Sequence, residues 1–201
     1  MNEKPYHHGG LRAALLVAGE AELAERGVEG FSLRSVAKRA EVSHAAPAHH
    51  FGDVRGLLTA LATEGFSRFQ AALDAREAGI PDRRERAVAA ALGYLDFAVT
   101  RPALFRLIFS SAKTDVLDPD LLAAASIAYR HLVWLIEELG GGEADVAALW
   151  AMSHGIADLA SGGRLRIVSS LPETEREVMI RNLIGRVLPG VRAVSLPAGS
   201  A

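Results

Sequence analysis

Two sets of polar residues in this 201-residue chain have the side chains and spacing to bind a charged partner or to support chemistry. The first set lies within residues 32–50. It combines hydroxyl, guanidinium and imidazole groups, which belong to Ser32, Arg34, Ser43, His44, His49 and His50. These groups donate hydrogen bonds to anionic oxygens, and a capped helix N-terminus adds free N–H groups that suit a phosphate. The second set is His154 and Asp158, which stand one helical turn apart and could support a metal pair.

Signatures of catalysis are otherwise missing from the sequence. It has no Gly-rich phosphate loop and no nucleophile elbow, and the lack of cysteine excludes disulfides and thiolate metal sites. His154 and Asp158 have no third ligand nearby, so we assign no metal, no cofactor and no catalytic residue. A protein that is not an enzyme is expected, with a helical enzyme that uses His154 and Asp158 left open as an alternative.

The composition is that of an ordinary soluble protein. Half of the residues are apolar and 23% are charged, which suffices for a sizeable core. The first ten residues lack an apolar signal core, and no apolar run approaches the roughly 20 residues of a membrane-spanning helix. A cytoplasmic protein without membrane contact is therefore expected. Residues 1–56 contain seven basic and seven acidic residues within a chain of net charge −2, so their attraction for nucleic acid is weak.

Helical periodicity covers nearly the whole chain and is interrupted by Gly, Pro and Asp. It predicts an all-α fold with an N-terminal three-helix module in residues 1–56, a larger helical domain in 57–190 and a flexible tail in 191–201. Ser32, Ser43, Asp53 and Asp82 are expected to cap helices. The expected helices cover residues 10–26, 32–40, 44–50, 53–78, 83–100, 103–110, 119–139, 143–159 and 173–188.

Two of these helices are short and are joined by a tight turn, which is the helix-turn-helix pattern. The first needs a small residue where the helices cross, and Ala37 supplies it; the turn needs a compact apolar residue, which is Val42. The second helix needs a cap and small or polar residues facing outward, so that its N-terminus can enter a major groove. Ser43, His44, Ala45 and Ala46 meet that need.

Residues 31–58, FSLRSVAKRAEVSHAAPAHHFGDVRGLL, resemble the DNA-binding core of the tetracycline-repressor (TetR) family. The resemblance implies that these residues face double-stranded DNA: Ser32, Arg34, Ser43, His44, Ala45, Ala46, His49 and His50. Three positions depart from the family pattern. Glu41 stands in the turn where the family usually has Gly, Ala48 stands where it often has Tyr, and Val54 stands where it often has Lys. These departures keep open an alternative, a helical ligand-binding protein whose DNA contacts have decayed.

Residues 101–110, RPALFRLIFS, and 150–155, WAMSHG, resemble the C-terminal domain of a TetR subgroup with a Trp…His-Gly element. The resemblance implies a homodimer that pairs through the helices in 143–159 and 173–188, and a palindromic operator. It further implies a repressor that a small, mostly apolar effector releases through a tilt of the helix in 53–78. We expect aromatic and polar side chains of the middle helices to bind that effector: Phe97, Phe105, Phe109, Trp134, Trp150, Met152 and His154.

Overall fold

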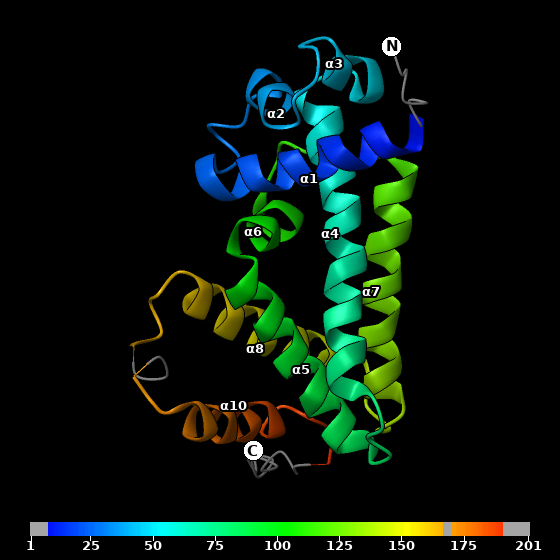
Figure 1. Ribbon diagram of the computed structural model, residues 1–201. Coiled ribbons are helices and arrows are strands. Elements are labelled where there is room, and N and C mark those ends of the chain that lie inside the picture. Colours follow the sequence, from blue (N-terminus) through cyan, green and yellow to red (C-terminus); the bar gives the residue numbers. More distant parts are fainter. Residues whose placement is uncertain (1–7, 167–169, 191–201) are drawn as a thin grey trace, which may run out of the picture. The chain divides into compact units, whose positions relative to one another are not determined.

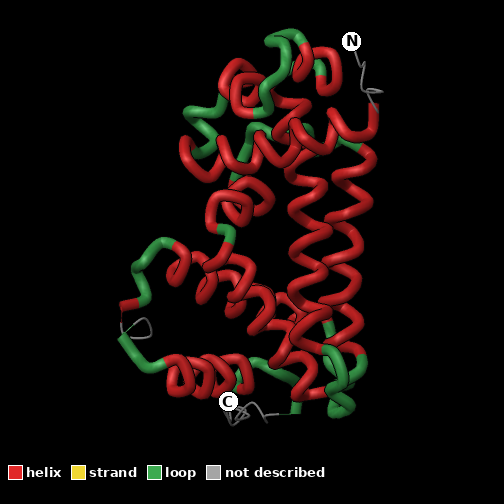
Figure 2. Tube along the Cα trace, viewed as in Figure 1, coloured by secondary structure: helices red, strands yellow, loops and turns green. Residues whose placement is uncertain are grey.

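The computed structural model describes residues 8–166 and 170–190, and all regular structure in these two ranges is helical (Figures 1 and 2), which confirms the all-α fold class. The predicted tail, 191–201, lies outside the described residues. The helices are α1 His8–Arg26, α2 Leu33–Arg39, α3 Ala46–Phe51, α4 Val54–Glu77, α5 Arg83–Thr100, α6 Pro102–Ser110, α7 Pro119–Glu137, α8 Glu143–Ser161 and α10 Glu173–Gly185.

Side-chain caps fix the starts of several helices, as the sequence predicts. Asp53 Oδ1 accepts a hydrogen bond from Gly56 N at 2.8 Å at the start of α4, and Asp82 Oδ1 accepts one from Glu85 N at 2.8 Å at the start of α5. Each cap satisfies a backbone N–H that the helix itself leaves unpaired, and stabilises the helix by about 1 kcal/mol. α1 ends before Gly27, whose φ of 65° is a conformation that glycine adopts without steric cost.

The described chain forms two compact units, each assembled from separate stretches of sequence. Unit 1 contains the residues up to Gln70 together with Thr100–Ile127, and unit 2 contains Ala71–Val99 together with the residues from Ala128 onward. α4 and α7 each contribute residues to both units. The predicted domain division after residue 56 stays a prediction, because units defined by contacts do not test it.

The core of unit 1 lies beneath the short helices. α1 packs against α2 and α6, and α2 packs against α3 (Figure 1). Leu15, Leu23, Val36, Leu57 and Leu58 are all completely buried. Full burial of one such side chain stabilises the fold by about 1.5–3 kcal/mol. This core holds α2 and α3 on a fixed platform.

In unit 2, α5 is the central element, and it is buried from Ala87 to Tyr94. A Cβ atom on Gly93 would lie 2.6 Å from the carbonyl oxygen of Ala72, so α5 crosses α4 with its backbone in close approach. α8 packs against α10.

Within the described ranges, no single helix has both the length and the apolar character to cross a membrane. The pair formed by α5 and α6 meets those two criteria jointly, with a bend of 111° between its members.

Candidate nucleic-acid interface and ligand site

α2 is the supporting helix of the expected helix-turn-helix. Ser32 has an extended backbone, and its hydroxyl accepts a hydrogen bond from Ser35 N at 3.5 Å, so the predicted cap is confirmed. Val36 and Ala37 are completely buried, whereas Arg34 and Lys38 are exposed. α2 therefore buries one face in unit 1 and presents its basic face outward.

The turn that follows α2 has the conformation that usually requires glycine. Glu41 has a φ of +56°, and no other non-glycine residue in the described ranges has a positive φ. Val42 N donates to Ala37 O at 3.1 Å, which closes the turn. A side chain at position 41 therefore lies in the left-handed region, which is strained for residues other than glycine. Its carboxylate is exposed beside α3.

The start of α3 differs from the prediction. Ser43 does not cap it: the helix begins at Ala46, its N-cap is Ala45, and no side chain bonds to the free N–H groups. The backbone explains the difference, because Ser43 O accepts from Ala46 N at 3.0 Å and residues 43–46 form a separate turn. Pro47 follows in the first helical turn, where a missing N–H costs nothing.

The predicted DNA-contact residues lie on the turn, on α3 and on the first half of α2. Five of them are exposed and three are half-buried; the exposed ones are Arg34, Ser43, His44, Ala45 and His49, and the half-buried ones are Ser32, Ala46 and His50. Such a surface of small, hydroxyl and imidazole side chains can approach a base edge closely and donate to phosphates. Their contacts with DNA remain predictions.

One basic residue near this surface was missed by sequence reasoning. The guanidinium carbon of Arg12, on α1, lies 5.3 Å from the centre of the Phe51 ring at the end of α3. Tertiary packing places these residues together from positions far apart in the chain, so no local motif signals the pair. Arg12 is exposed and adds a positive charge beside α3.

Arg39, the last residue of α2, forms ion pairs within the protein that link α2 to α1. Its guanidinium contacts Glu25 Oε2 at 2.5 Å and Glu22 Oε2 at 3.3 Å, both on α1. The hydrogen bond from Arg39 holds the pKa of Glu25 below its ordinary value, and the bond to Glu25 raises the pKa of Arg39. Arg39 therefore anchors α2 to α1 instead of pointing to a partner.

The predicted effector-binding residues are divided between the two units. Phe105 and Phe109 belong to unit 1, where they form an aromatic cluster with Phe66 and Phe69 at centroid distances of 5.2–5.6 Å. Phe97, Trp134, Trp150, Met152 and His154 belong to unit 2. Phe97 is buried, but Trp134 and Trp150 are 39% and 44% exposed. Neither unit by itself brings all seven residues together.

A hydrogen-bonded trio around the buried Tyr94 gives three residues of unit 2 a defined arrangement. Tyr94 Oη lies 2.8 Å from His154 Nδ1 and also bonds to the Trp150 side chain, four residues earlier on α8. Burial raises the pKa of Tyr94, and the Trp150 hydrogen bond opposes that shift. Tyr94 was not identified from sequence, because only the fold brings α5 against α8.

His154 and Asp158 do not converge on a common ligand. His154 faces Tyr94, and Asp158 Oδ2 bonds to Arg164 at 2.5 Å. The metal pair considered from their spacing is therefore not formed.

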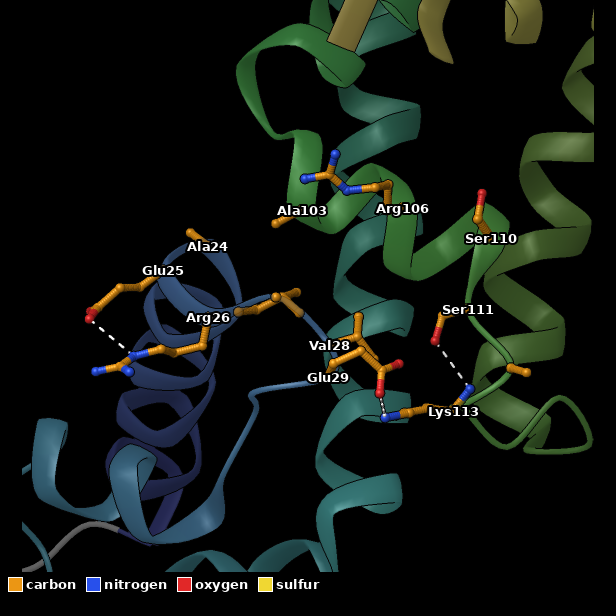
Figure 3. A pocket seen from close by; sticks show the side chains of 13 residues that line it. Ala24, Glu25, Arg26, Val28, Glu29, Ala103, Arg106, Ser110, Ser111 and Lys113 are labelled. Carbon is orange, nitrogen blue, oxygen red and sulfur yellow. Dashed lines mark hydrogen bonds and ion pairs between the residues drawn. The ribbon is translucent and has the colours of Figure 1, made fainter. Parts of the chain in front are cut away.

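A separate pocket opens in unit 1 between the end of α1 and α6 (Figure 3). Its volume is about 590 Å³, and its walls include Arg26, Arg106 and Lys113 together with two serines, Ser110 and Ser111. Lys113 Nζ contacts Glu29 Oε2 at 2.5 Å at this pocket. None of the predicted effector-binding residues lines it.

Comparison with known proteins gives two family matches, one for each end of the chain. Residues 15–61 match a model described as bacterial regulatory proteins of the tetR family, and residues 87–183 match one described as a tetracyclin repressor-like C-terminal domain. The first match contains α2, the turn and α3. A search of curated proteins gave no match.

Solved structures with the same fold include a protein of unknown function from Rhodococcus sp. RHA1, with 35% identity over 92% of this chain and 99% of that one and a TM-score of 0.77. A TetR-like transcriptional regulator from Rhodococcus sp. RHA1 shares 19% identity with this protein, and the alignment covers 92% of this chain and 99% of that one with a TM-score of 0.67. The transcriptional regulator FadR from Bacillus subtilis, solved in complex with stearoyl-CoA, shares 14% identity over 90% of this chain and 99% of its own, with a TM-score of 0.66. The chain therefore belongs to the TetR family of bacterial transcriptional regulators, with an N-terminal helix-turn-helix for DNA binding.

Proposed function

We propose that this regulator binds a palindromic operator as a homodimer, represses transcription there, and is released by a small, mostly apolar effector. The observation that carries the proposal is the exposed surface of residues 43–50, next to an α2 whose inner face is anchored by the buried Val36 and Ala37. A short helix held on a packed platform, with its small and hydrogen-bonding side chains exposed, suits insertion into a major groove. We propose that the protein is not an enzyme and that it acts in the cytoplasm.

The proposed DNA contacts divide by side-chain chemistry. Arg34 is exposed and makes no hydrogen bond or ion pair within the described ranges, so its guanidinium can contact a phosphate or a guanine edge. Ala45, also exposed, can contact a thymine methyl group. Ser43, His44, His49 and His50 can donate to phosphates, which positions the helix without reading sequence.

Binding to the DNA upstream of the regulator's own gene and of the neighbouring genes tests the proposal. We expect a duplex from one of these regions to be retained, and Arg34→Ala to weaken binding about 10-fold, which corresponds to about 1.4 kcal/mol. Arg130→Ala is the matched control, because it removes an exposed arginine from α7 in unit 2. Loss of affinity in both variants alike would point to a nonspecific charge effect.

The alternative function is a helical ligand-binding protein that no longer binds DNA. The exposed carboxylate of Glu41 favours it, because that charge repels phosphates from the edge of α3. Ala48 and Val54, which stand where the family often has Tyr and Lys, remove expected contacts. Failure to retain any of the upstream duplexes at low salt would favour this alternative over the proposed repressor.

Dimerisation is proposed through α8 and α10. These helices, which pack against each other, leave Trp150, Leu159 and Val178 between 40% and 58% exposed, and a second protomer could cover this apolar surface. Ala147 and Ala151 are exposed on α8 as well and permit close helix approach. A two-fold axis through such helices would pair two reading heads and match a palindromic operator.

Effector binding is supported by the fold of FadR from Bacillus subtilis, which was solved with stearoyl-CoA. The ligand in that structure carries a long apolar acyl chain, so a fatty acyl-CoA serves here as the probe for an apolar effector. We propose that the five predicted residues that belong to unit 2, Phe97, Trp134, Trp150, Met152 and His154, contact the effector. Two of them, Trp134 and Trp150, are partly exposed.

The two tryptophans, which are the only ones in the chain, provide the readout. Titration with a fatty acyl-CoA should change the tryptophan fluorescence and release operator DNA over the same concentration range. Trp150→Phe should remove more of the fluorescence change than Trp134→Phe if the effector lies near the Tyr94 trio. Saturating acyl-CoA without DNA release would contradict this class of effector.

A further inference from the structure

The end of α4 and the middle of α7 bring three metal-binding side chains together in unit 2. Asp74 and Glu77 are one helical turn apart on α4, and His131 is on α7. One ligand atom from each residue lies within 4.8 Å of the other two. Both donors of α4 share a face because residues i and i+3 of a helix are neighbours.

The burial of Glu77 separates this cluster from ordinary surface acids. Its side chain is 8% exposed and that of His131 is 18% exposed. Removing a carboxylate from water is costly unless a cation or several hydrogen bonds compensate. Glu77 Oε1 lies 2.7 Å from His131 Nε2, and Oε2 bonds to no described residue, so this oxygen is available to a ligand.

The arginines nearby do not fill this role. Arg76, beside Glu77 on α4, contacts Asp96 Oδ2 at 2.6 Å and Glu177 Oε2 at 3.6 Å. Arg86 lies over the Trp134 ring, with its guanidinium carbon 5.2 Å from the ring centre. Neither arginine forms an ion pair with Glu77 in the described residues, so neither neutralises this carboxylate.

We propose that Asp74, Glu77 and His131 bind one divalent transition-metal ion of the Zn²⁺ type. One imidazole nitrogen and two carboxylate oxygens are ligands that Zn²⁺ accepts at about 2.0–2.2 Å, with a water in the fourth position. The imidazole favours a borderline ion over Mg²⁺ or Ca²⁺, which prefer oxygen ligands. The ion takes the place of the proton between Nε2 and Oε1, and these two atoms move apart to about 3.4 Å, the spacing of two ligands on a tetrahedral ion.

Such an ion links the last turn of α4 to α7 within unit 2. Binding to the folded state alone shifts the folding equilibrium, so the ion should raise the thermal midpoint in proportion to the logarithm of its concentration. None of the three ligands is itself a proposed operator or effector contact, but the His131 ring lies 5.6 Å from that of Trp134, a proposed effector contact. Metal binding can be tested without DNA and without effector.

Titration of the full-length, chelator-treated protein with Co²⁺, followed by displacement with Zn²⁺, tests the proposal. We expect one Co²⁺ per chain, with visible absorption bands of a four- or five-coordinate ion that Zn²⁺ abolishes. Asp74→Asn removes an exposed ligand and should lower the affinity at least 10-fold while leaving the metal-free protein folded, as should His131→Gln.

Asp158→Asn and His44→Gln are the matched controls, because each removes a possible ligand away from the cluster; both should bind Co²⁺ like the wild type. Circular dichroism checks that the His131→Gln protein is folded. If that variant is unfolded, the affinity of Asp74→Asn for Co²⁺ alone decides the test. Lack of saturable binding in the wild type would overturn the site, and so would an unchanged affinity in Asp74→Asn. Binding of Mg²⁺ in preference to Zn²⁺ would overturn the proposed class of ion.

Discussion

At the residue scale, Glu41 combines two unfavourable features in one turn. Its φ of +56° places a side chain in the left-handed region, which costs about 1–2 kcal/mol for a residue other than glycine. Its exposed carboxylate also lies beside the helix proposed to enter DNA. We predict that Glu41→Gly raises the free energy of unfolding by about 0.5–1 kcal/mol, since the greater chain entropy of glycine offsets part of the gain. Denaturant unfolding measures this change.

The same residue allows strain and charge to be separated. Glu41→Gln keeps the side chain in the left-handed region but removes its charge, so it should leave the stability near that of the wild type. Both variants should bind DNA more tightly, because both remove the repulsion of phosphates. A stability gain as large in Glu41→Gln as in Glu41→Gly would show that backbone strain is not the cause.

Tyr94 makes the stability of unit 2 sensitive to alkaline pH. Burial raises its pKa above the ordinary value of 10.0, so the folded state retains the phenolic proton to higher pH than the unfolded chain does. The resulting contribution to stability is fully present below pH 10 and is lost as the pH rises above it, with a slope of up to about 1.4 kcal/mol per pH unit. We predict that Tyr94→Phe removes this part of the pH dependence between pH 9 and 11.

The hydrogen bond to His154 gives the same variant a second signature. At pH 8 Tyr94→Phe should be less stable by about 1–2 kcal/mol, because His154 Nδ1 loses its partner in a partly buried site. Urea unfolding at several pH values measures both effects. Tyr129→Phe, which removes a hydroxyl from a residue that is 52% exposed, is the control. Parallel pH profiles for Tyr94→Phe and the wild type would contradict the argument.

At the element scale, the crossing of α5 and α4 depends on the missing side chain of Gly93. An added Cβ would lie 2.6 Å from Ala72 O and 2.9 Å from Leu73 Cα, both backbone atoms that have little room to move. We predict that Gly93→Ala lowers the free energy of unfolding by about 1–3 kcal/mol, the usual cost of overpacking. Gly10→Ala in α1 has nothing within 4 Å and should be neutral or slightly stabilising. Equal effects of the two substitutions on thermal unfolding would argue against close packing at Gly93.

Local chemistry explains which elements could be predicted from sequence. Asp53 and Asp82 each cap a helix through a backbone N–H three residues away, so the sequence alone contains both partners. Ser43 looked like a similar cap and was not one, because the backbone forms a turn over residues 43–46 before α3 begins. Local pattern does not distinguish those two conformations.

The candidate site in unit 2, in contrast, could not be predicted from the sequence, because it depends on contacts between distant residues. The Tyr94–His154 bond and the Glu77–His131 pair each join residues more than 50 positions apart, and no spacing rule relates them. Trp134 and Trp150 were predicted to bind the effector because large aromatic side chains suit a mostly apolar ligand, and both are partly exposed. Only the packing of the helices shows which apolar side chains remain at the surface.

At the scale of the whole molecule, weak overall charge makes the proposed dimer essential for DNA binding. The net charge is −2, so one reading head gains little from general attraction to phosphates, and two heads on one operator must combine their affinities. A variant that separates the protomers should therefore lose operator affinity even though every DNA-contact residue is intact.

Val178→Asp is designed to separate them. Val178 is 58% exposed on α10, so the substitution should leave the monomer folded while it places a charge in the proposed apolar interface, where an unpaired charge is costly. We predict a monomer in sedimentation at micromolar concentration, and operator affinity at least 100-fold weaker. Leu117→Asp is the control, since it charges a side chain that is 79% exposed in unit 1 and should leave both properties unchanged. A Val178→Asp protein that remains dimeric would place the interface elsewhere, whereas a monomer with full affinity would show that one reading head binds the operator alone.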